Sequence, residues 1–176
     1  ELEAIIKRQI DMNGPMAVDT YWNLCLAHPE HGYYITRDPL GEKGDFTTAP
    51  EISQLFGEVI GVWVGEQWHR LGSPSKFHLV ECGPGRGTLM ADLLRIGKII
   101  PDFIAAAHIH LIETSPILRQ KQREILKGYN VLWHEDFETI PDDAPLIVIA
   151  NEFLDALPIQ QFVFQGNQWF EKVIGI

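Results

Sequence analysis

Residues 76–150 alternate between short apolar runs and segments with helical periodicity, and this alternation constrains the fold more than any other feature. The apolar runs predict strands at 77–81, 109–112, 131–133 and 146–150, and the periodic segments predict helices at 88–95 and 116–126. The last run, "LIVIA", is apolar throughout, as is typical of a buried parallel strand. The pattern predicts an α/β fold with an open, mostly parallel sheet and helices on both of its faces.

Residues 1–72 are expected to form a helical extension with a long loop. Residues 1–13 have an amphipathic pattern that Gly14 and Pro15 end, and residues 18–27 are expected to form a second short helix. The loop that follows contains several glycines and prolines and a pair of tyrosines. Loops of this length in compact domains are usually functional or disordered, and the aromatic residues favour an ordered loop.

A long helix is predicted from Thr48 to about Arg70, because apolar residues recur there at helical spacing. Thr48 and Glu51 match a capping box at its start, and Pro50 is tolerated in the first turn. Glycines recur every four residues along this helix, at positions 57, 61 and 65. Acidic residues in the same helix exclude a membrane span, so we expect the glycines to allow the close approach of a neighbouring element.

After Pro158 the apolar residues repeat every two positions. "QQFVFQ" and "QWFEKVIGI" flank a Gly-Asn pair, which predicts a hairpin or paired strands around a tight turn. An open α/β sheet should contain further strands, so residues 73–176 are expected to be the core of the fold, incomplete at its carboxyl end. We interpret the chain as the N-terminal portion of a larger protein.

The composition argues against several functions. The chain has 176 residues with 24 acidic and 14 basic side chains, and its formal charge of −10 disfavours a nucleic-acid-binding protein. Cys25 and Cys82 form no CxxC motif, so we expect a reducing compartment and neither a disulfide framework nor a zinc site. The scattered histidines are interpreted as surface or packing residues rather than metal ligands. No apolar run approaches the ~20 residues that span a bilayer, and no signal peptide is visible.

The stretch "LVECGPGRGTLM", residues 79–90, places alternating glycines directly after the first predicted strand. Two cofactor classes use such a turn. The dinucleotide fingerprint GxGxxG fits Gly83 and Gly85, but its third position falls on Thr88. Glu81 also disfavours a dinucleotide, because a carboxylate beside two phosphates is repulsive.

The second class binds S-adenosylmethionine (SAM), which carries an ammonium at its methionine end and a sulfonium at its centre. A nearby acid attracts these charges, and glycines let the backbone lie against the ligand. The methyltransferase pattern of an acid followed by GxGxG is satisfied at Glu81, Gly83, Gly85 and Gly87, with Pro84 inside the loop. The loop therefore favours SAM.

Polar and aromatic residues follow the second and third predicted strands. Glu113 ends "HIHLIE", where its carboxylate could accept hydrogen bonds from both ribose hydroxyls of an adenosine, and Thr114 follows it. Thr114 or Ser115 is also expected to cap the next helix. Asp136 and Phe137, in "HEDF", suit the amino group and the ring face of adenine. Both cofactor classes contain adenosine, so these residues do not separate them.

"NEFLDALP" follows the fourth predicted strand, where a transferred methyl group should point. Asn151 and Glu152 lie at the carboxyl end of that strand. Two interpretations have similar weight: the residues belong to the reaction site, or Asn151 caps the next helix and Glu152 lies in its first turn. One residue can have both roles.

Five blocks of the sequence resemble the MidA-type SAM-dependent methyltransferases. The blocks are "GPMAVDTYW", "HPEHGYY", "GDFTTAPEISQLFGE", "ECGPGRGTLMADLLR" and "NEFLDALPIQQF", and they occur in the family's order over nearly the whole chain. The resemblance implies a class I (Rossmann-like) SAM-methyltransferase fold with an N-terminal helical extension. It also implies that the loop from Gly44 to Pro50 covers the cofactor, so Phe46 and Thr47 join the cofactor-binding candidates.

The resemblance further implies methylation of a protein arginine; the target of bacterial-type members is less defined. Eukaryotic members methylate a subunit of respiratory complex I in mitochondria, so the expected location is the mitochondrial matrix for a eukaryotic source and the cytoplasm for a bacterial one. No nucleic acid or membrane partner is implied. The sequence does not define the oligomeric state, the exact target or the number of methyl groups transferred.

Carboxylates are needed to direct a protonated guanidinium toward the methyl group, and proximity would supply most of the rate. The candidates are Glu152, Asp155, Asp45 and Glu51. Glu152 is the first choice because it follows the fourth strand, and Asn151 and Asp45 complete the predicted catalytic set. Glu51 is assigned to the capping box. Arg86 would meet the SAM carboxylate or lie exposed on the helix.

Two other functions remain open at this point. One is an assembly factor with a SAM fold, in which partner binding matters more than catalysis. The other is a nicotinamide-dependent oxidoreductase, which the glycine pattern disfavours. Binding of SAM, its demethylated product and NAD separates the oxidoreductase from the methyltransferase.

Overall fold

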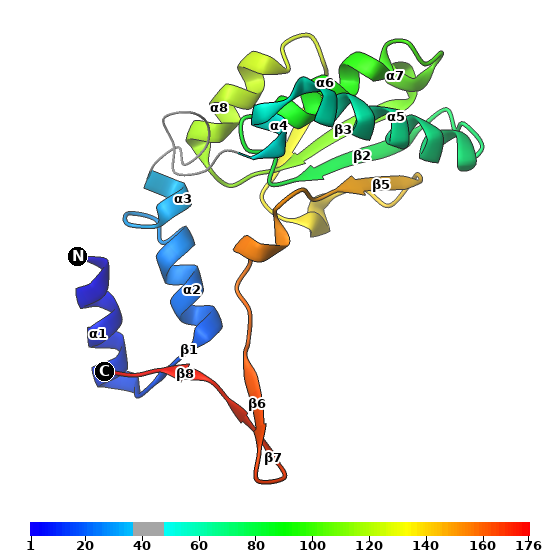
Figure 1. Ribbon diagram of the computed structural model, residues 1–176. Coiled ribbons are helices and arrows are strands. Elements are labelled where there is room, and N and C mark those ends of the chain that lie inside the picture. The colour runs from blue at the N-terminus through cyan, green and yellow to red at the C-terminus, as the bar shows by residue number, and fades with distance from the viewer. Residues whose placement is uncertain (37–47) are drawn as a thin grey trace. The chain divides into compact units, whose positions relative to one another are not determined.

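The computed structural model describes residues 1–36 and 48–176 (Figure 1). The chain divides into two compact units, one formed by Glu1–Arg37 with Leu154–Ile176 and the other by Asp38–Phe153. The second unit holds the parallel sheet and also the helix at residues 54–70. This grouping differs from the division at residue 72 that the sequence suggested, because that helix packs against the sheet and its helices.

The sheet unit contains four strands in the order β4–β3–β2–β5. The strands are β2 (Phe77–Cys82), β3 (Ala107–Ile112), β4 (Val131–His134) and β5 (Leu146–Ile149). All of their pairings are parallel, and Glu81 lies opposite both Leu111 and Ile149. The strands run outward from β2 to β4, and the chain then returns to the other side of β2, which creates a switch point between β2 and β5. The predicted α/β fold and its four parallel strands are confirmed.

Helices cover one face of this sheet. They are α5 (Gln54–Arg70), α6 (Thr88–Gly97) and α8 (Pro116–Ile125), with the short α4 (Ala49–Ile52) and α7 (Phe103–Ala106) beside them. Their apolar side chains pack on odd-numbered strand residues such as Leu79 and Leu111. Trp68, Phe77 and Phe103 form an aromatic cluster within this core, with ring centroids 5.2–6.3 Å apart. This core therefore joins α5, α6 and α7 to the sheet.

The opposite face of the sheet carries even-numbered residues. Ile140 and Phe153 pack on part of it, and η1 (Phe137–Thr139) is one turn of 3-10 helix beside it. We expected helices on both faces, but within residues 48–153 no long helix covers this one. Leu146 and Val148 are each 40% exposed. The expectation that "LIVIA" is a fully buried strand is therefore wrong for this part of the chain, because β5 lies at the edge of the four-stranded sheet.

The predicted helix from Thr48 to Arg70 is divided at Ser53 into α4 and α5. The Thr48 side chain makes no capping hydrogen bond. The Glu51 carboxylate accepts a hydrogen bond from the Thr88 hydroxyl at 2.6 Å. The predicted capping box is therefore wrong, because Glu51 finds its partner on another helix rather than at the start of its own.

The glycines of α5 allow α6 to approach closely, as predicted. A Cβ atom at Gly57 would lie 2.6 Å from the Cβ of Asp92, and one at Gly61 would lie 2.9 Å from the Leu93 carbonyl oxygen. A Cβ atom at Gly65 would collide with Ile100. A side chain at Gly57 or Gly61 would separate α5 from α6, and one at Gly65 would have to displace the end of the Ile100 side chain.

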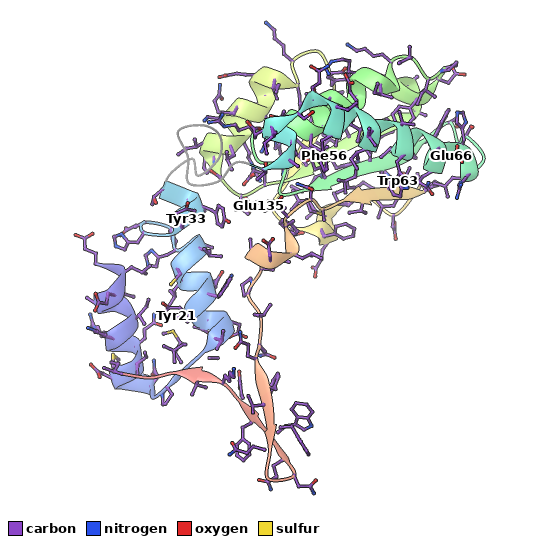
Figure 2. All side chains as sticks on the ribbon, in the orientation of Figure 1. Tyr21, Tyr33, Phe56, Trp63, Glu66 and Glu135 are labelled. Atoms are coloured by element: carbon purple, nitrogen blue, oxygen red, sulfur yellow. The ribbon has the colours of Figure 1, made fainter. Side chains whose placement is uncertain are left out.

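The other unit combines helices with short antiparallel strands. Its elements are α1 (Leu2–Asn13), β1 (Met16–Ala17), α2 (Val18–Ala27), α3 (Tyr33–Thr36), η2 (Leu154–Ala156), β6 (Phe162–Gln165), β7 (Gln168–Glu171) and β8 (Val173–Ile174). A small core forms around Ile6, Ile10 and Met16, and Tyr21 packs against it (Figure 2). The Trp22 indole N–H donates to the Ala156 carbonyl at 3.2 Å, which ties α2 to the segment after residue 153.

The predicted hairpin is confirmed as β6 and β7, which pair antiparallel. Gly166 and Asn167 connect them with φ angles of 57° and 67°. Positive φ at both central residues is the signature of a type I′ turn, for which Gly and Asn are suited. After the hairpin, β8 pairs with β1, with Met16 opposite Ile174.

Candidate functional site

The carboxyl ends of the four parallel strands lie at one edge of the sheet, where ligands of open α/β folds bind (Figure 1). Backbone hydrogen bonds join neighbouring connections there: the Gly83 N–H donates to the Ile112 carbonyl at 3.0 Å, and the Glu113 N–H donates to the His134 carbonyl at 3.1 Å. The described site candidates all lie at or directly after these strand ends: Glu81, Gly83, Pro84, Gly85, Gly87, Glu113, Thr114, Asp136, Phe137, Asn151 and Glu152.

The glycine loop, residues 83–87, needs its glycines for two reasons. Gly83 has a φ of 63°, and a Cβ atom there would lie 2.5 Å from the Phe153 ring. Gly87 has a φ of 87° and is the N-cap of α6, and its N–H donates to the Pro84 carbonyl at 2.8 Å. Left-handed backbone of this kind favours glycine. The loop therefore turns tightly from β2 into α6, with the ring of Phe153 against its first residue.

Glu81 is buried, with 3% of its surface exposed. Among residues 1–36 and 48–176, its Oε2 atom has no hydrogen-bond partner. Burial raises the pKa of the Glu81 carboxyl to about 8, so this group is mostly protonated at neutral pH. An unpaired buried acid is costly unless a partner compensates it, and such groups are candidates for binding sites.

Glu113 is half-buried and held by several donors. The Ser115 backbone N–H donates to its Oε1 at 2.8 Å, and the Gln122 side chain donates to its Oε2 at 3.3 Å. Burial raises the pKa of the Glu113 carboxyl, and the hydrogen bonds oppose that effect. Ser115 caps α8 by accepting from the Leu118 N–H at 3.4 Å. Of the two predicted caps, Ser115 is thus the one that forms, and Thr114 is exposed.

The side chains after β4 are exposed. Asp136 caps η1, since its Oδ1 accepts from the Thr139 N–H at 3.1 Å. Phe137 is the first residue of η1 and is 46% exposed. Arg119 of α8 donates to the Glu113 carbonyl at 2.6 Å and to the His134 carbonyl at 3.0 Å. The ends of β3 and β4 are thereby held together.

The turn after β5 contains Asn151, Glu152 and Phe153. Glu152 is exposed and has a φ of 48°, an uncommon conformation for a residue with a side chain. Strained backbone of this kind often occurs at functional sites. The α-helix that Asn151 was expected to cap does not form there, because the chain makes a turn and then one turn of 3-10 helix, η2.

Three predicted site residues, Asp45, Phe46 and Thr47, lie outside the described residues. Asp155, the alternative carboxylate, belongs to the unit that contains η2.

Sequence reasoning missed two side chains that contact the glycine loop or its helix. Glu51 accepts from Thr88, the first residue of α6, and its Oε2 lies 3.7 Å from Nη1 of Arg86. Gln122 of α8 donates to the Gly85 carbonyl at 2.7 Å. The match of Glu51 to a capping box concealed its role, and a glutamine inside an amphipathic helix gives no signal that separates it from a surface residue.

Three of the histidines form a hydrogen-bonded row that the sequence did not indicate. His78, His110 and His134 lie side by side on β2, β3 and β4, with nitrogen–nitrogen distances of 2.8 and 2.9 Å. His78 Nε2 lies 2.8 Å from Asp143 Oδ1, and His134 Nδ1 lies 2.7 Å from the Thr139 hydroxyl. An ionised carboxylate only accepts, so His78 carries its proton on Nε2. Among the described residues, no cluster of His, Cys, Asp or Glu has the arrangement of a metal site.

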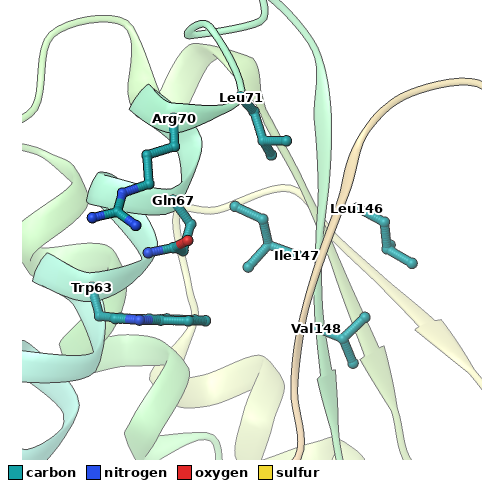
Figure 3. A pocket seen from close by; sticks show the side chains of 7 residues that line it. All are labelled: Trp63, Gln67, Arg70, Leu71, Leu146, Ile147 and Val148. Carbon is teal, nitrogen blue, oxygen red and sulfur yellow. The ribbon is translucent and has the colours of Figure 1, made fainter.

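A separate hollow of about 310 Å³ lies between α5 and β5 (Figure 3). Its lining includes Trp63, Arg70 and Leu146. Trp63 and Glu66 are exposed side chains of α5 (Figure 2). Leu146 is the first residue of β5, so this hollow is distinct from the edge at which the strands end. In the described part of the chain, no helix is long and apolar enough to cross a membrane.

A parallel sheet with a glycine loop after one strand and an acid after the next is typical of proteins that bind an adenosine-containing ligand. The chain belongs to a family of SAM-dependent methyltransferases: the family model described as "Putative S-adenosyl-L-methionine-dependent methyltransferase" matches residues 59–176. The class that the fold indicates and the family that the sequence matches therefore agree, and they confirm the resemblance found in the sequence.

Curated relatives are identical to this chain at about a third of the aligned positions. "Protein arginine methyltransferase NDUFAF7 homolog, mitochondrial" from Drosophila melanogaster is 36% identical over 97% of this chain and 44% of its own length. The protein arginine methyltransferase NDUFAF7 from Homo sapiens, also mitochondrial, is 35% identical over 96% of this chain and 43% of its own length. The chain thus spans less than half the length of these relatives.

A solved structure matches the fold closely. It is a crystal structure from Burkholderia thailandensis, described as a "likely methyl transferase" and bound to S-adenosyl-homocysteine, and it is 27% identical to this chain with a TM-score of 0.78. The match covers 99% of this chain and 46% of the crystallised one. The similar protein therefore binds the demethylated product of SAM.

Proposed function

We propose that this chain forms the cofactor-binding part of a SAM-dependent protein arginine methyltransferase. Glu81 is the observation that carries the proposal, because a buried carboxyl group with an unpaired oxygen lies two residues before Gly83, the start of the glycine loop. A cationic ligand would compensate that group, whereas a pyrophosphate would repel its ionised form. The residues present therefore fit SAM and disfavour a dinucleotide.

Each strand end supplies part of the proposed site. The backbone of the glycine loop would lie against the ligand, with Pro84 shaping the turn. Glu113 would accept the ribose hydroxyls, with Thr114 beside it, since a carboxylate can accept more hydrogen bonds than those from Ser115 and Gln122. Asp136 and Phe137 would bind the adenine, and the resemblance adds Phe46 and Thr47.

When bound, SAM supplies a methyl group on a positively charged sulfur. The task of the chain is to hold the arginine near it and to exclude other orientations. We propose that Glu152 directs the guanidinium, because it is exposed at the carboxyl end of β5 on strained backbone. Asn151, which is half-buried beside it, and Asp45 complete the proposed catalytic set.

The proposed substrate is a protein, because the relatives are named protein arginine methyltransferases. A subunit of respiratory complex I is the substrate that the family resemblance implies. The relatives are also named as mitochondrial, which supports the mitochondrial matrix as the location in a eukaryotic source. The cytoplasm is the corresponding location in a bacterial source.

Calorimetric titration of the full-length protein with SAM, S-adenosyl-homocysteine (SAH) and NAD tests the proposal. We expect binding of SAM and SAH and none of NAD, and binding of NAD alone would overturn it. A methylation assay with radiolabelled SAM and the candidate subunit then tests the reaction. Glu152→Gln should reduce methyl transfer while SAH affinity stays unchanged, and full activity in that variant would remove Glu152 from the mechanism.

The same assays separate two other functions. An oxidoreductase would bind NAD, but Thr88 occupies the third position of the dinucleotide fingerprint, as the first residue of α6 bonded to Glu51. An assembly factor without catalysis would bind SAM and its partner yet transfer no methyl group.

A further inference from the structure

Gln122 is a fully buried polar residue in the middle of α8. Its Nε2 donates to the Gly85 carbonyl at 2.7 Å and to Oε2 of Glu113 at 3.3 Å. Its Oε1 accepts from the Trp133 indole N–H at 2.8 Å. Both amide hydrogens are therefore used, and the carbonyl oxygen is anchored on β4.

These three hydrogen bonds reach three separate parts of the sheet edge. Gly85 is in the loop after β2, Glu113 follows β3, and Trp133 is in β4. The donor side of the amide faces the loop and the acid that are proposed to bind SAM. The acceptor side faces a residue outside the proposed site. The Gln122 side chain thus fixes the position of the glycine loop relative to Glu113, the acid that is proposed to bind the ribose.

Packing adds to this fixation. A Cβ atom at Gly87 would lie 3.3 Å from Cγ of Gln122 and 3.0 Å from Cγ2 of Ile125. Helix α8 therefore lies directly against the last glycine of the loop. The Gln122 side chain therefore has little room to move on the side of the glycine loop.

A buried glutamine can also be a core residue whose polar atoms simply find partners. That alternative predicts that its loss lowers stability and leaves ligand selectivity unchanged. Two features favour a role at the site. Both N–H groups point to atoms of the proposed cofactor site, and one acceptor is a carboxyl group that would itself bind the ligand.

We propose that Gln122 is a positioning residue for SAM binding: its side chain holds the Glu113 carboxyl and the Gly85 carbonyl in the arrangement that the bound cofactor requires. This inference rests on the proposed function. With one Glu113 oxygen held by Gln122 and the other by the Ser115 N–H, the plane of the carboxyl group is set before the ligand arrives. Preorganisation of this kind raises affinity because less freedom is lost on binding.

Gln122→Met tests the inference, since methionine has a similar length but cannot donate to Gly85 or Glu113. We expect the dissociation constant for SAH to rise about tenfold in calorimetry of the full-length protein. Gln120→Met is the matched control, because Gln120 is exposed on the same helix and bonds only Glu124 among its described partners. Its SAH affinity should equal that of the wild type.

A second readout separates positioning from stability. Wild type should bind SAH more tightly than its 2′-deoxy analogue, because Glu113 accepts from the ribose. The ratio of these two affinities should be smaller in Gln122→Met. A double variant that combines Glu113→Gln with Gln122→Met should lose less binding free energy for SAH than the sum of the two single variants. A core-packing role would lower the melting temperature and leave the ratio of the two affinities unchanged.

Trp133→Phe provides a milder test if Gln122→Met does not fold. It removes the anchor of the Gln122 carbonyl and keeps both amide hydrogens, so SAH affinity and ribose discrimination should fall in the same direction by a smaller factor. If the folded variant keeps the SAH affinity and the ribose discrimination of the wild type, the inference about Gln122 is overturned and the proposed function is not affected. A wild type that binds no SAH would instead contradict the proposed function and the inference together.

Discussion

The Glu51 carboxylate of α4 accepts a 2.6 Å hydrogen bond from the hydroxyl of Thr88, the first residue of α6. Glu51 is only 16% exposed at its side chain, and Arg86 of the glycine loop lies 3.7 Å away. This contact ties the segment before α5 to the point where the glycine loop enters α6. The start of α6 is therefore held by a residue 37 positions earlier in the chain.

Thr88→Val should lower the free energy of unfolding by about 1–2 kcal/mol, because it removes a partly buried hydrogen bond to a carboxylate. Chemical denaturation measures this change. A double-variant cycle with Glu51→Leu supplies the control, since leucine cannot accept the hydrogen bond and the two changes should be less than additive if they act through one contact. Additive losses would show that the hydrogen bond contributes nothing to stability.

Gly83→Ala should destabilise the protein by about 2–4 kcal/mol. Alanine is disfavoured at a φ of 63°, and its Cβ would collide with the Phe153 ring. Gly72→Ala is the matched control, because Gly72 also has a positive φ, of 87°, but no atom lies within 4 Å of its added Cβ. The control should cost only about 1 kcal/mol. Equal losses in the two variants would remove the collision from the explanation.

The sequence predicted the regular elements well and the contacts between them poorly. The glycine spacing of α5 and the Gly-Asn turn of the hairpin are local patterns. The first predicted close approach of a neighbouring element and the second a tight turn, and the structure confirms both. The partner of Glu51 lies on a different helix, so its spacing from Thr48 predicted the wrong contact.

The same limit applies to the candidate site. The order of Glu81, Glu113 and Asp136 at the carboxyl ends of successive strands predicted the edge of the sheet at which they lie, because parallel strands all end on one side. The burial of Glu81 and the orientation of Gln122 depend on packing between elements distant in the chain. The spacing of residues along the sequence does not indicate which distant elements pack against each other.

The raised pKa of Glu81 predicts a characteristic dependence of stability on pH. In the unfolded chain this carboxyl ionises near pH 4.5, and in the folded protein it ionises near pH 8. Between these values the unfolded state loses a proton that the folded state keeps, so stability should fall as pH rises from 4.5 to 8. Glu81→Gln should lack this component, which is at most about 5 kcal/mol. Parallel pH profiles of wild type and variant would contradict the burial of this acid.

The same acid predicts proton release when SAM binds at pH 7. A cationic ligand should lower the pKa of the Glu81 carboxyl and expel its proton. Calorimetry in buffers with different ionisation enthalpies measures the number released, which should approach one per ligand in the wild type. Glu81→Gln should bind SAM more weakly and release none. Release by the variant equal to that of the wild type would assign the proton to another group.

His110 should remain neutral well below pH 6. It is 1% exposed, and burial together with His78 and His134 lowers its pKa to about 4. The unfolded chain takes up a proton near pH 6.5, so stability should fall as pH drops from 6.5 to 4, by at most about 3 kcal/mol. NMR titration of the ring and unfolding measurements test this. His110→Gln should flatten the pH dependence, whereas His69→Gln, at an exposed position of α5, should not.

The glycines at positions 57, 61 and 65 have a consequence for how this helix can vary. Added side chains at Gly57 and Gly61 would strike Asp92 and Leu93, and one at Gly65 would have to displace the Ile100 side chain, so one side of α5 leaves little room beyond glycine. Val59, Val62 and Trp63 are 51–59% exposed on the rest of the helix. Substitutions that alter what α5 presents to its surroundings are therefore confined to that outer side, while the glycine side preserves the distance between two backbones.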